Sequence, residues 1–167
     1  GKVSFEAVFV DDASKDGTVQ ALLDARKQTP ELRVLRHAKN SGQSRAVRTG
    51  VIGARGKLVV TLDGDGQNDP ADIPNLLAAW ANESRGSPAL GLVAGQRRKR
   101  EDNAIKRVSS RIANGVRQWL LEDNTRDTGC GLKLFSREAF LTLPYFDHLH
   151  RFLPALMLRQ GGGIQSV

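Results

Sequence analysis

Cysteine, aromatic residues and long apolar runs are all scarce in this chain of 167 residues. Its single cysteine, Cys130, excludes an internal disulfide framework and a zinc site built from several cysteines, and it fits a reducing, cytosolic setting. Aromatic residues make up 5% of the chain, so few side chains are present on which nucleobases can stack. No run of about eighteen apolar residues occurs, so we expect no membrane-spanning helix within this sequence. The length fits one domain with a single core, over residues 1–167.

The chain has an excess of basic residues, and they are unevenly distributed. Its 25 Lys and Arg residues oppose 18 Asp and Glu residues, which gives a net charge of +7. Basic residues gather at positions 97–117, where Glu101 and Asp102 are the only acids. Such a cluster attracts polyanions, which include nucleic acid, acidic lipid head groups and phosphorylated substrates. A solvated basic surface without a partner is the alternative that the sequence leaves open.

An acidic loop, residues 62–70 with the sequence LDGDGQNDP, follows the short apolar run at 58–61. An apolar run closed by Gly and Asp predicts a buried strand that ends in a loop. Asp63 and Asp65 are two positions apart, so along an extended backbone their side chains project to the same side. Two neighbouring carboxylates repel each other unless a cation lies between them, and hard oxygen ligands suit Mg²⁺ or Mn²⁺. We therefore interpret the loop as a metal–diphosphate site.

Three other interpretations compete for this loop. A solvated turn is the commonest setting for an Asp-x-Asp pair. An EF-hand fails, because the sixth position of the loop is Asn68 where Gly is needed, and the twelfth is Pro74 where Glu is needed. A phosphatase of the haloacid-dehalogenase kind also places Asp-x-Asp after an apolar strand, so it remains a rival.

Strands and helices are predicted to alternate through the first half of the chain. Strands are expected at 3–10, 32–35 and 58–62, with helices at 18–28, 43–55 and 70–82, the last opened by Asp69 and Pro70. This alternation favours a mostly parallel sheet with helices on both faces. Ligands of such sheets lie beyond the carboxyl ends of the strands, and four acids occupy such ends: Asp11, Asp12, Asp63 and Asp65. We predict that they meet at one edge of the sheet.

The second half of the chain continues with elements of the same kinds. A strand at 90–94 precedes the basic segment, and a helix is expected at 104–121. A Gly-rich loop then leads into a short strand before Ser136, which is predicted to cap a brief helix. A further helix is expected to end at Gly161, followed by a strand from Ile164. His37 is predicted to be a surface residue, and Cys130 to be a small core residue rather than a nucleophile.

Four segments, in this order, resemble the motifs of one enzyme family. Residues 10–18 (VDDASKDGT) are similar to the first nucleotide-binding motif of family 2 glycosyltransferases with the GT-A fold, and residues 40–56 resemble its second segment. Residues 62–70 resemble the Asp-x-Asp motif of that family. Residues 127–135 (DTGCGLKLF) are similar to the Asp-x-x-Gly segment of its dolichol-phosphate mannosyltransferase-like branch, which comprises polyprenyl-phosphate glycosyltransferases.

The resemblance implies a function. That branch moves a sugar, with inversion, from a UDP- or GDP-linked donor to a polyprenyl phosphate such as dolichyl or undecaprenyl phosphate. The expected protein is a metal-dependent glycosyltransferase of the cell envelope, peripheral on the cytosolic face of a membrane and without a nucleic-acid partner. The sequence leaves its oligomeric state, the sugar and the base open.

The resemblance also implies site residues, carried over position by position. Asp11 and Asp12 would hold the base and ribose of the nucleotide. Asp63, Asp65 and Gln67 would hold Mg²⁺ or Mn²⁺ and, through it, the diphosphate. The residues nearest the reaction would be Asp65 and Asp127. The acceptor phosphate would meet donors of the basic segment, namely Arg97, Arg107, Ser110 and Arg111.

Two departures from the family pattern lead us to expect a fragment of a longer protein. The family normally begins with a strand and a Pro-x-x-Asn-Glu-type motif, whereas this chain starts after that strand. The chain also stops inside a predicted strand. We therefore expect an α/β sheet that lacks its N-terminal strand and has an unpaired edge.

Two other functions compete with the glycosyltransferase. A phosphohydrolase would use Asp63 as its nucleophile, but its motif normally continues with Thr where this chain has Gln67, and it lies on the first strand. A nucleic-acid-binding module rests on the basic segment alone, where aromatic residues are scarce.

Overall fold

The computed structural model describes residues 3–83, 90–95 and 130–167. The chain divides into two compact units, one formed by Gly1–Val59 with Ser136–His150 and the other by Val60–Phe135 with Arg151–Val167. Both units combine strands with flanking helices, so the predicted α/β class is confirmed. The prediction of one domain over residues 1–167 stays a prediction.

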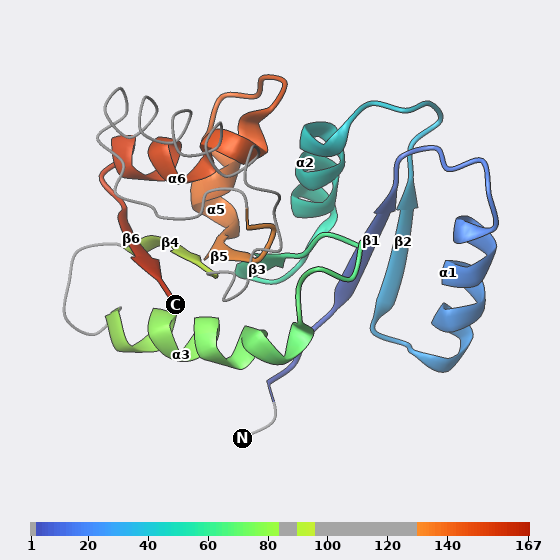
Figure 1. Cartoon of the computed structure of the whole chain (residues 1–167), viewed down its shortest axis with the longest axis horizontal. Helices are drawn as coiled ribbons and strands as arrows, with labels where there is room; N and C mark the ends of the chain where they lie inside the picture. The colour runs from blue at the N-terminus through green and yellow to red at the C-terminus, as the bar shows by residue number, and fades with distance from the viewer. Residues whose placement is uncertain (1–2, 84–89, 96–129) are drawn as a thin grey trace, which may run out of the picture. The chain divides into compact units, whose positions relative to one another are not determined.

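The first unit is built on two parallel strands. Strand β1 (Ala7–Asp11) pairs with β2 (Leu32–Arg36) so that Ala7 lies opposite Leu32 and Asp11 opposite Arg36. Helix α1 (Thr18–Gln28) connects the two strands, and α2 (Gln43–Gly53) packs against β1 (Figure 1). Because the strands are parallel, the loops that follow them leave from the same end of the sheet.

Short polar segments set the beginnings of these helices. Before α1, Asp16 Oδ1 accepts hydrogen bonds from the Thr18 amide at 3.0 Å and the Thr18 hydroxyl at 2.6 Å. Before α2, Gly42 has a φ of +84°, a left-handed conformation that favours glycine. The predicted strand at 3–10 begins only at Ala7, and Val3 and Phe5 before it are 69% and 67% exposed. Residues 3–6 have the apolar pattern of a strand, but the pairing of β1 with β2 begins only at Ala7, so the pattern alone overestimates the length of the strand.

Helix α5 (Arg137–Leu141) completes the first unit. The predicted cap is confirmed, since Ser136 Oγ accepts from the Ala139 amide at 3.4 Å. Arg137 donates from Nε to the carbonyl of Val51 at 3.0 Å and from Nη2 to that of Ile52 at 3.1 Å. These bonds satisfy two of the carbonyl groups that the end of α2 leaves unpaired.

The second unit is built on a four-stranded sheet in the order β3-β5-β4-β6. Its strands are β3 (Leu58–Thr61), β5 (Lys133–Ser136), β4 (Leu90–Ala94) and β6 (Gly163–Ser166). Strand β4 runs parallel to β6 and antiparallel to β5, so this sheet is mixed. The predicted strands at 58–62 and 90–94 are confirmed, and the last strand begins one residue before its predicted start.

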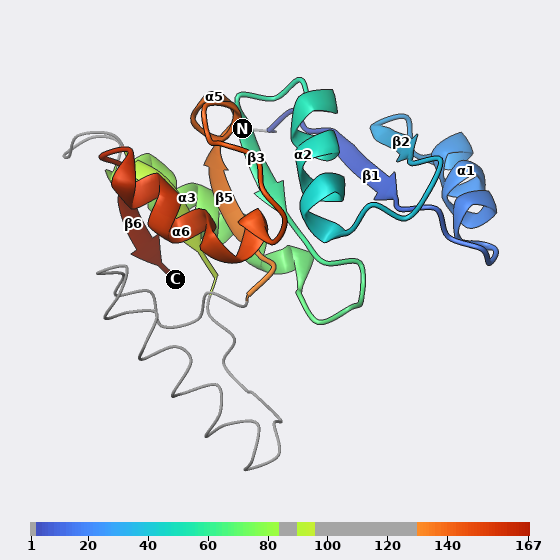
Figure 2. The same ribbon diagram turned by 90° about the horizontal axis from the view of Figure 1, so that it is seen from above.

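Two helices cover opposite faces of this sheet, as the two views of the ribbon show (Figures 1 and 2). One is α3 (Ile73–Glu83), which follows a short 3₁₀ turn, η1 (Pro70–Asp72), and the other is α6 (Leu149–Arg159). Asp69 caps η1 through a bond from the Ala71 amide at 2.9 Å, as the sequence predicts. Leu76 of α3, Val93 of β4 and Leu134 of β5 form a buried cluster that includes Cys130. Within the described residues, no helix has the length and apolar character needed to cross a bilayer.

Candidate functional site: acidic side chains at the ends of β1 and β3

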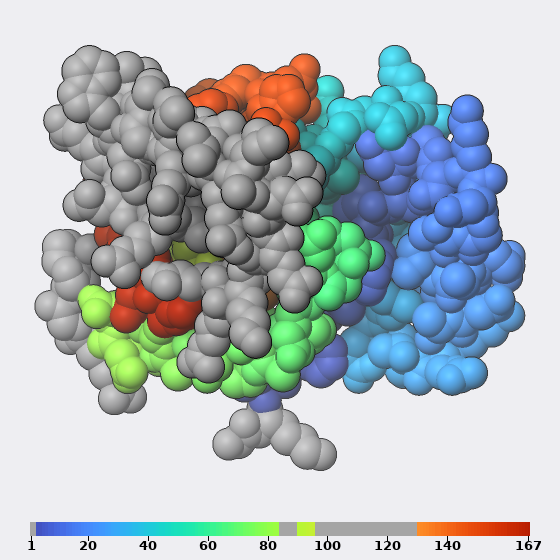
Figure 3. All heavy atoms as spheres, viewed as in Figure 1, coloured from blue at the N-terminus to red at the C-terminus, as the bar shows by residue number. Residues whose placement is uncertain are grey.

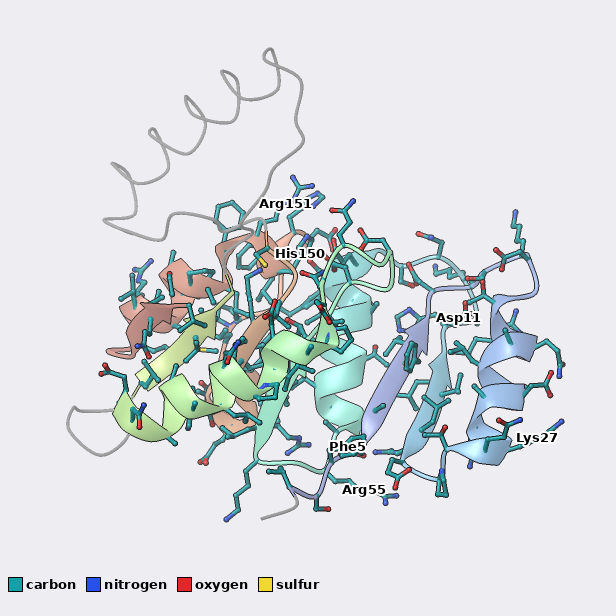
Figure 4. All side chains as sticks on the ribbon, turned by 60° about the horizontal axis from the view of Figure 1, so that its bottom comes forward. Phe5, Asp11, Lys27, Arg55, His150 and Arg151 are labelled. Carbon is teal, nitrogen blue, oxygen red and sulfur yellow. The ribbon has the colours of Figure 1, made fainter. Side chains whose placement is uncertain are left out.

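Asp11 is the last residue of β1, and its side chain is 0% exposed. Its Oδ1 accepts a hydrogen bond from the Ser14 amide at 3.2 Å, and its Oδ2 lies 3.3 Å from Arg36 Nε on β2. Ala13, which precedes Ser14 in the sequence, has a φ of +64°, and this left-handed conformation turns the chain back toward Asp11. Figure 4 shows Asp11 at the carboxyl end of β1, with Phe5 and Arg55 at the opposite end. The carboxylate of Asp11 therefore closes the loop after β1 and has no surface available to a ligand.

Asp12 has a different setting, because its side chain is 20% exposed. Its Oδ1 accepts from the Ser41 amide at 2.8 Å and lies 2.7 Å from His37 Nδ1, and its Oδ2 accepts from the Gly42 amide at 2.7 Å. Burial raises the pKa of Asp12, but the bonds from His37, Ser41 and Gly42 together outweigh it and hold the pKa below its usual value. Asp12 is therefore an ionised acceptor that fastens the segment leading into α2.

The prediction that His37 is a surface residue is wrong. Its side chain is 14% exposed, and Nε2 lies 2.9 Å from Thr49 Oγ1 on α2 while Nδ1 meets Asp12. The His37 amide donates to the carbonyl of Asp11 at 2.9 Å, which extends the pairing of β1 with β2 by one residue. The pairing of His37 with Asp12 could have been predicted from a parallel alignment of the two strands. In that alignment Asp11 lies opposite Arg36, so the next residues, Asp12 and His37, are neighbours.

Two arginines of α2 gather around Tyr145 in the same unit. The guanidinium carbons of Arg45 and Arg48 lie 4.7 Å and 5.5 Å from the centre of the Tyr145 ring, within cation–π range. Arg48 Nη1 is buried and has no hydrogen-bond partner in the described part of the chain. Nearby on α2, Ser44 Oγ is 2.7 Å from His150 Nδ1. The first turns of α2 thus carry positive charge, held in place by an aromatic ring.

In the second unit, Asp63 follows β3 and is partly buried. A Cβ atom added to Gly131 would collide with Asp63 Oδ2. The same Cβ would be 3.1 Å from Asn68 Nδ2, which is buried and unpartnered in the described residues, and Cys130 Sγ donates to Asn68 Oδ1 at 3.7 Å. The carboxylate of Asp63 therefore lies directly on the backbone of the Gly-rich loop, where only glycine leaves room for it.

Asp65 and Gln67 are exposed residues of the same loop. The segment that contains this loop is coloured green in Figure 3, where it lies at the surface of the face shown. Asp65 Oδ1 accepts from the Gln67 amide at 3.0 Å, and Gly66 between them has a φ of +75°. This tight turn leaves Asp65 Oδ2 without a partner among the described residues and open to solvent. A backbone that bends in this way also lets a ligand approach closely, because no Cβ projects from Gly64 or Gly66.

The donor set of this loop fits a hard divalent cation. Two carboxylates and one amide oxygen, from Asp63, Asp65 and Gln67, are the ligand types that Mg²⁺ and Mn²⁺ accept. No group of three or more His, Cys, Asp or Glu side chains that could enclose a metal occurs in the described ranges. The loop therefore suits a cation that shares its coordination with water and phosphate oxygens, rather than one enclosed by protein alone.

Several predicted site residues cannot be placed beside these. One set lies outside the described residues, and it comprises Arg97, Arg107, Ser110, Arg111 and Asp127. Asp11 and Asp12 belong to the first unit, and Asp63 and Asp65 to the second. The meeting of all four acids at one edge of a sheet stays a prediction.

The fold is that of the GT-A glycosyltransferases. A mannosyltransferase from Pyrobaculum calidifontis in complex with GDP-Man and Mn²⁺ aligns with a TM-score of 0.69 at 22% identity, over 97% of this chain and 45% of that one. Glucosyl-3-phosphoglycerate synthase from Mycobacterium tuberculosis, in complex with Mn²⁺, UDP and glucosyl-3-phosphoglycerate, aligns with a TM-score of 0.73 at 20% identity, over 97% and 58% of the two chains.

The family follows from the sequence comparison: the glycosyl transferase family 2 model matches residues 2–143, and this chain belongs to that family. It is 33% identical to dodecaprenyl-phosphate galacturonate synthase from Rhizobium johnstonii, over 90% of this chain and 44% of the relative. It is 36% identical to undecaprenyl-phosphate 4-deoxy-4-formamido-L-arabinose transferase from Pseudomonas savastanoi pv. phaseolicola, over 91% and 44%. The chain thus spans less than half the length of these relatives.

Proposed function

We propose that this chain is the donor-binding part of an inverting glycosyltransferase that moves a sugar from a nucleoside-diphosphate sugar to a polyprenyl phosphate. The observation that carries the proposal is the loop with Asp63 and Asp65 at the end of β3, in a chain of glycosyl transferase family 2. The relatives named above are, by their names, polyprenyl-phosphate synthases and transferases, which supports this class of acceptor.

The nucleoside of the donor is assigned to the end of β1. Asp12 is ionised and 20% exposed, so it accepts a hydrogen bond from a base N–H or a ribose hydroxyl. Asp11 is fully buried and paired with Arg36, so its role in the proposal is to shape the loop. The proposal therefore keeps Asp12 as a nucleotide contact and assigns Asp11 a structural role.

The diphosphate is assigned to the loop after β3. Asp63, Asp65 and Gln67 would hold a divalent cation, Mg²⁺ or Mn²⁺, and the solved relatives with Mn²⁺ support that choice of ion class. When bound, such a cation stabilises the negative charge that develops on the leaving nucleoside diphosphate. Gly131 keeps Asp63 in place, and the turn at Gly66 fixes the direction of the Asp65 carboxylate.

The acceptor needs no strong general base from the protein. A phosphate monoester is already anionic near pH 7, so its oxygen is a nucleophile without losing a proton. Its charge calls for charge-assisted donors, and the proposal assigns them to Arg97, Arg107, Ser110 and Arg111. Asp127 is proposed as the carboxylate that orients donor or acceptor near the reaction, on the cytosolic face of a membrane.

Nucleotide binding tests the proposal, with the full-length protein that contains this chain. Thermal midpoints are measured with UDP, GDP and their sugars, each with and without Mn²⁺, because a ligand that binds the folded state raises the midpoint. We expect one nucleotide to stabilise the protein only when Mn²⁺ is present. Asp65→Asn should abolish this stabilisation and the transfer of sugar, whereas Asp72→Asn, in the following 3₁₀ turn, should retain both. Normal transfer by Asp65→Asn would overturn the proposal.

The phosphohydrolase alternative has its own readout. If Asp63 were the nucleophile of such an enzyme, simple aryl phosphates would be hydrolysed without any nucleotide sugar. Family membership favours the transferase, and we expect no release of phosphate from aryl phosphates. Strongly salt-dependent binding of oligonucleotides, without binding of a nucleotide sugar, would instead favour the nucleic-acid-binding module.

A further inference from the structure

His37 links the end of β2 to Asp12 and to α2. Its Nδ1 lies 2.7 Å from Asp12 Oδ1, and its Nε2 lies 2.9 Å from Thr49 Oγ1. All three side chains belong to the same compact unit, and the His37 side chain is 14% exposed. The ring is therefore held from both of its nitrogen atoms.

The chemistry of the partners determines the protons on this ring. An ionised carboxylate only accepts hydrogen bonds, so His37 Nδ1 must carry a hydrogen. The Thr49 hydroxyl both donates and accepts, so Nε2 is free to be unprotonated in the neutral ring. The neutral ring therefore carries its hydrogen on Nδ1, and the bond to Asp12 exists in both protonation states of His37.

The acceptor capacity of Asp12 is almost filled by these bonds. Each carboxylate oxygen has two lone pairs. Oδ1 receives His37 Nδ1 and the Ser41 amide, whereas Oδ2 receives only the Gly42 amide among the described residues. His37 and the Ser41 amide together fill both lone pairs of Oδ1, whereas one lone pair of Oδ2 is left, so Oδ2 is the oxygen that can accept a hydrogen bond from a ligand.

We propose that His37 is a positioning residue that fixes the Asp12 carboxylate so that Oδ2 accepts a hydrogen bond from the nucleoside of the donor. The inference rests on the proposed function, since the ligand of Asp12 is the nucleotide. Thr49 has the supporting role of orienting the His37 ring. The group recognised at Oδ2 is a hydrogen-bond donor, either a base N–H or a ribose hydroxyl, and a group that only accepts is rejected there.

Two matched variants separate positioning from mere folding. In His37→Asn the amide nitrogen is as many bonds from Cβ as Nδ1 is, so it reaches Asp12. In His37→Gln the amide nitrogen is as many bonds away as Nε2 is, so it reaches Thr49 instead. With the nucleotide and Mn²⁺ that stabilise the unmodified protein, we expect His37→Asn to bind within about threefold of it. We expect His37→Gln to bind about tenfold more weakly, because a hydrogen bond to a charged group is lost.

The ring proton gives a readout that needs no nucleotide. Nitrogen-15 NMR of the unliganded protein should show the neutral His37 ring in the Nδ1–H form, and Asp12→Asn should reduce the population of that form. An Nε2–H ring, or equal affinities of the Asn and Gln variants for the nucleotide, would overturn the inference. If the unmodified protein binds no nucleotide, the proposed function fails, and the inference about the ligand of Asp12 fails with it. An Nδ1–H ring in the same protein would still show that His37 holds Asp12, so the two failures are distinguishable.

Discussion

The carboxylate of Asp63 lies where a side chain at position 131 would have to be, because the Cβ that Gly131 lacks would collide with Asp63 Oδ2. The two residues are far apart in the sequence, and Asn68 Nδ2 borders the same space at 3.1 Å. The position of Asp63 therefore depends on glycine at 131.

Gly131→Ala tests this dependence. The added methyl group must displace Asp63, and crowding of this kind typically costs about 1–3 kcal/mol. We expect the Mn²⁺-dependent affinity for the nucleotide to fall about tenfold or more, measured by calorimetry. Gly17→Ala is the matched control, because its Cβ meets nothing within 4 Å. Unchanged affinity in Gly131→Ala would show that nucleotide binding does not depend on the position of Asp63 that Gly131 allows.

Asp11 and Asp12 are expected to respond differently to the same change. Asp11→Asn loses a buried charge opposite Arg36, so the free energy of unfolding should fall by about 1–3 kcal/mol. Asp12→Asn keeps the shape of the side chain but loses its charge, so nucleotide affinity should fall about tenfold. Urea unfolding and calorimetry on both variants check this. Loss of affinity in Asp11→Asn beyond its loss of folded protein would contradict the assignment of the nucleotide to Asp12.

Glu6 is expected to make folding sensitive to acid. Burial raises the pKa of Glu6, but hydrogen bonds from the Arg55 amide, the Arg33 side chain and the Gly56 amide, with the nearby Arg33 charge, outweigh burial and lower the pKa below its usual value. A lowered pKa stabilises the folded state above the unfolded pKa of about 4.3, and this contribution is lost as the pH falls through the folded value. The unfolding free energy should therefore fall between about pH 5 and pH 3.

Glu6→Gln isolates this effect from that of Asp12, which also has a lowered pKa. The variant should be less stable at pH 7, and its stability should fall less steeply than that of the unmodified protein over the same acid range. Urea unfolding at a series of pH values measures both slopes. Parallel slopes would mean that Glu6 titrates alike in the folded and unfolded chain.

Arg137 is expected to stabilise the end of α2. Arg137→Met keeps the aliphatic part of the side chain but leaves the carbonyls of Val51 and Ile52 without their donors. We expect the free energy of unfolding to fall by about 1–2 kcal/mol, as for other lost hydrogen bonds. Arg159→Met, at the exposed end of α6, is the control and should change stability by less than about 0.5 kcal/mol.

Local signals in the sequence predicted much of this fold. Strands at β1, β2 and β3 followed from short apolar runs, and the caps at Asp69 and Ser136 followed from residue types at helix starts. These features depend on neighbours in the sequence. They are therefore readable without the tertiary structure.

Features that depend on distant partners were not predicted. His37 was expected at the surface because nothing near it in the sequence indicates Asp12 or Thr49. Leu23 of α1 is 40% exposed, because apolar spacing along a helix does not say which face of that helix has a packing partner. The contact of Asp63 with Gly131 likewise arises only when two loops meet in space.

The start of α2 has no cap from its own side chains, and Asp12 of a different element accepts the amide of Gly42 in its place. The stability of the first turn of α2 is therefore coupled to any group that donates to the remaining lone pair of Asp12 Oδ2. A nucleoside bound there should slow hydrogen–deuterium exchange in that turn, several residues beyond any atom that it touches. Binding at Asp12 would then also affect Arg45, Arg48 and Tyr145, which lie on or beside this helix. None of these three residues is assigned a contact with the nucleoside, so the effect would reach them through the helix.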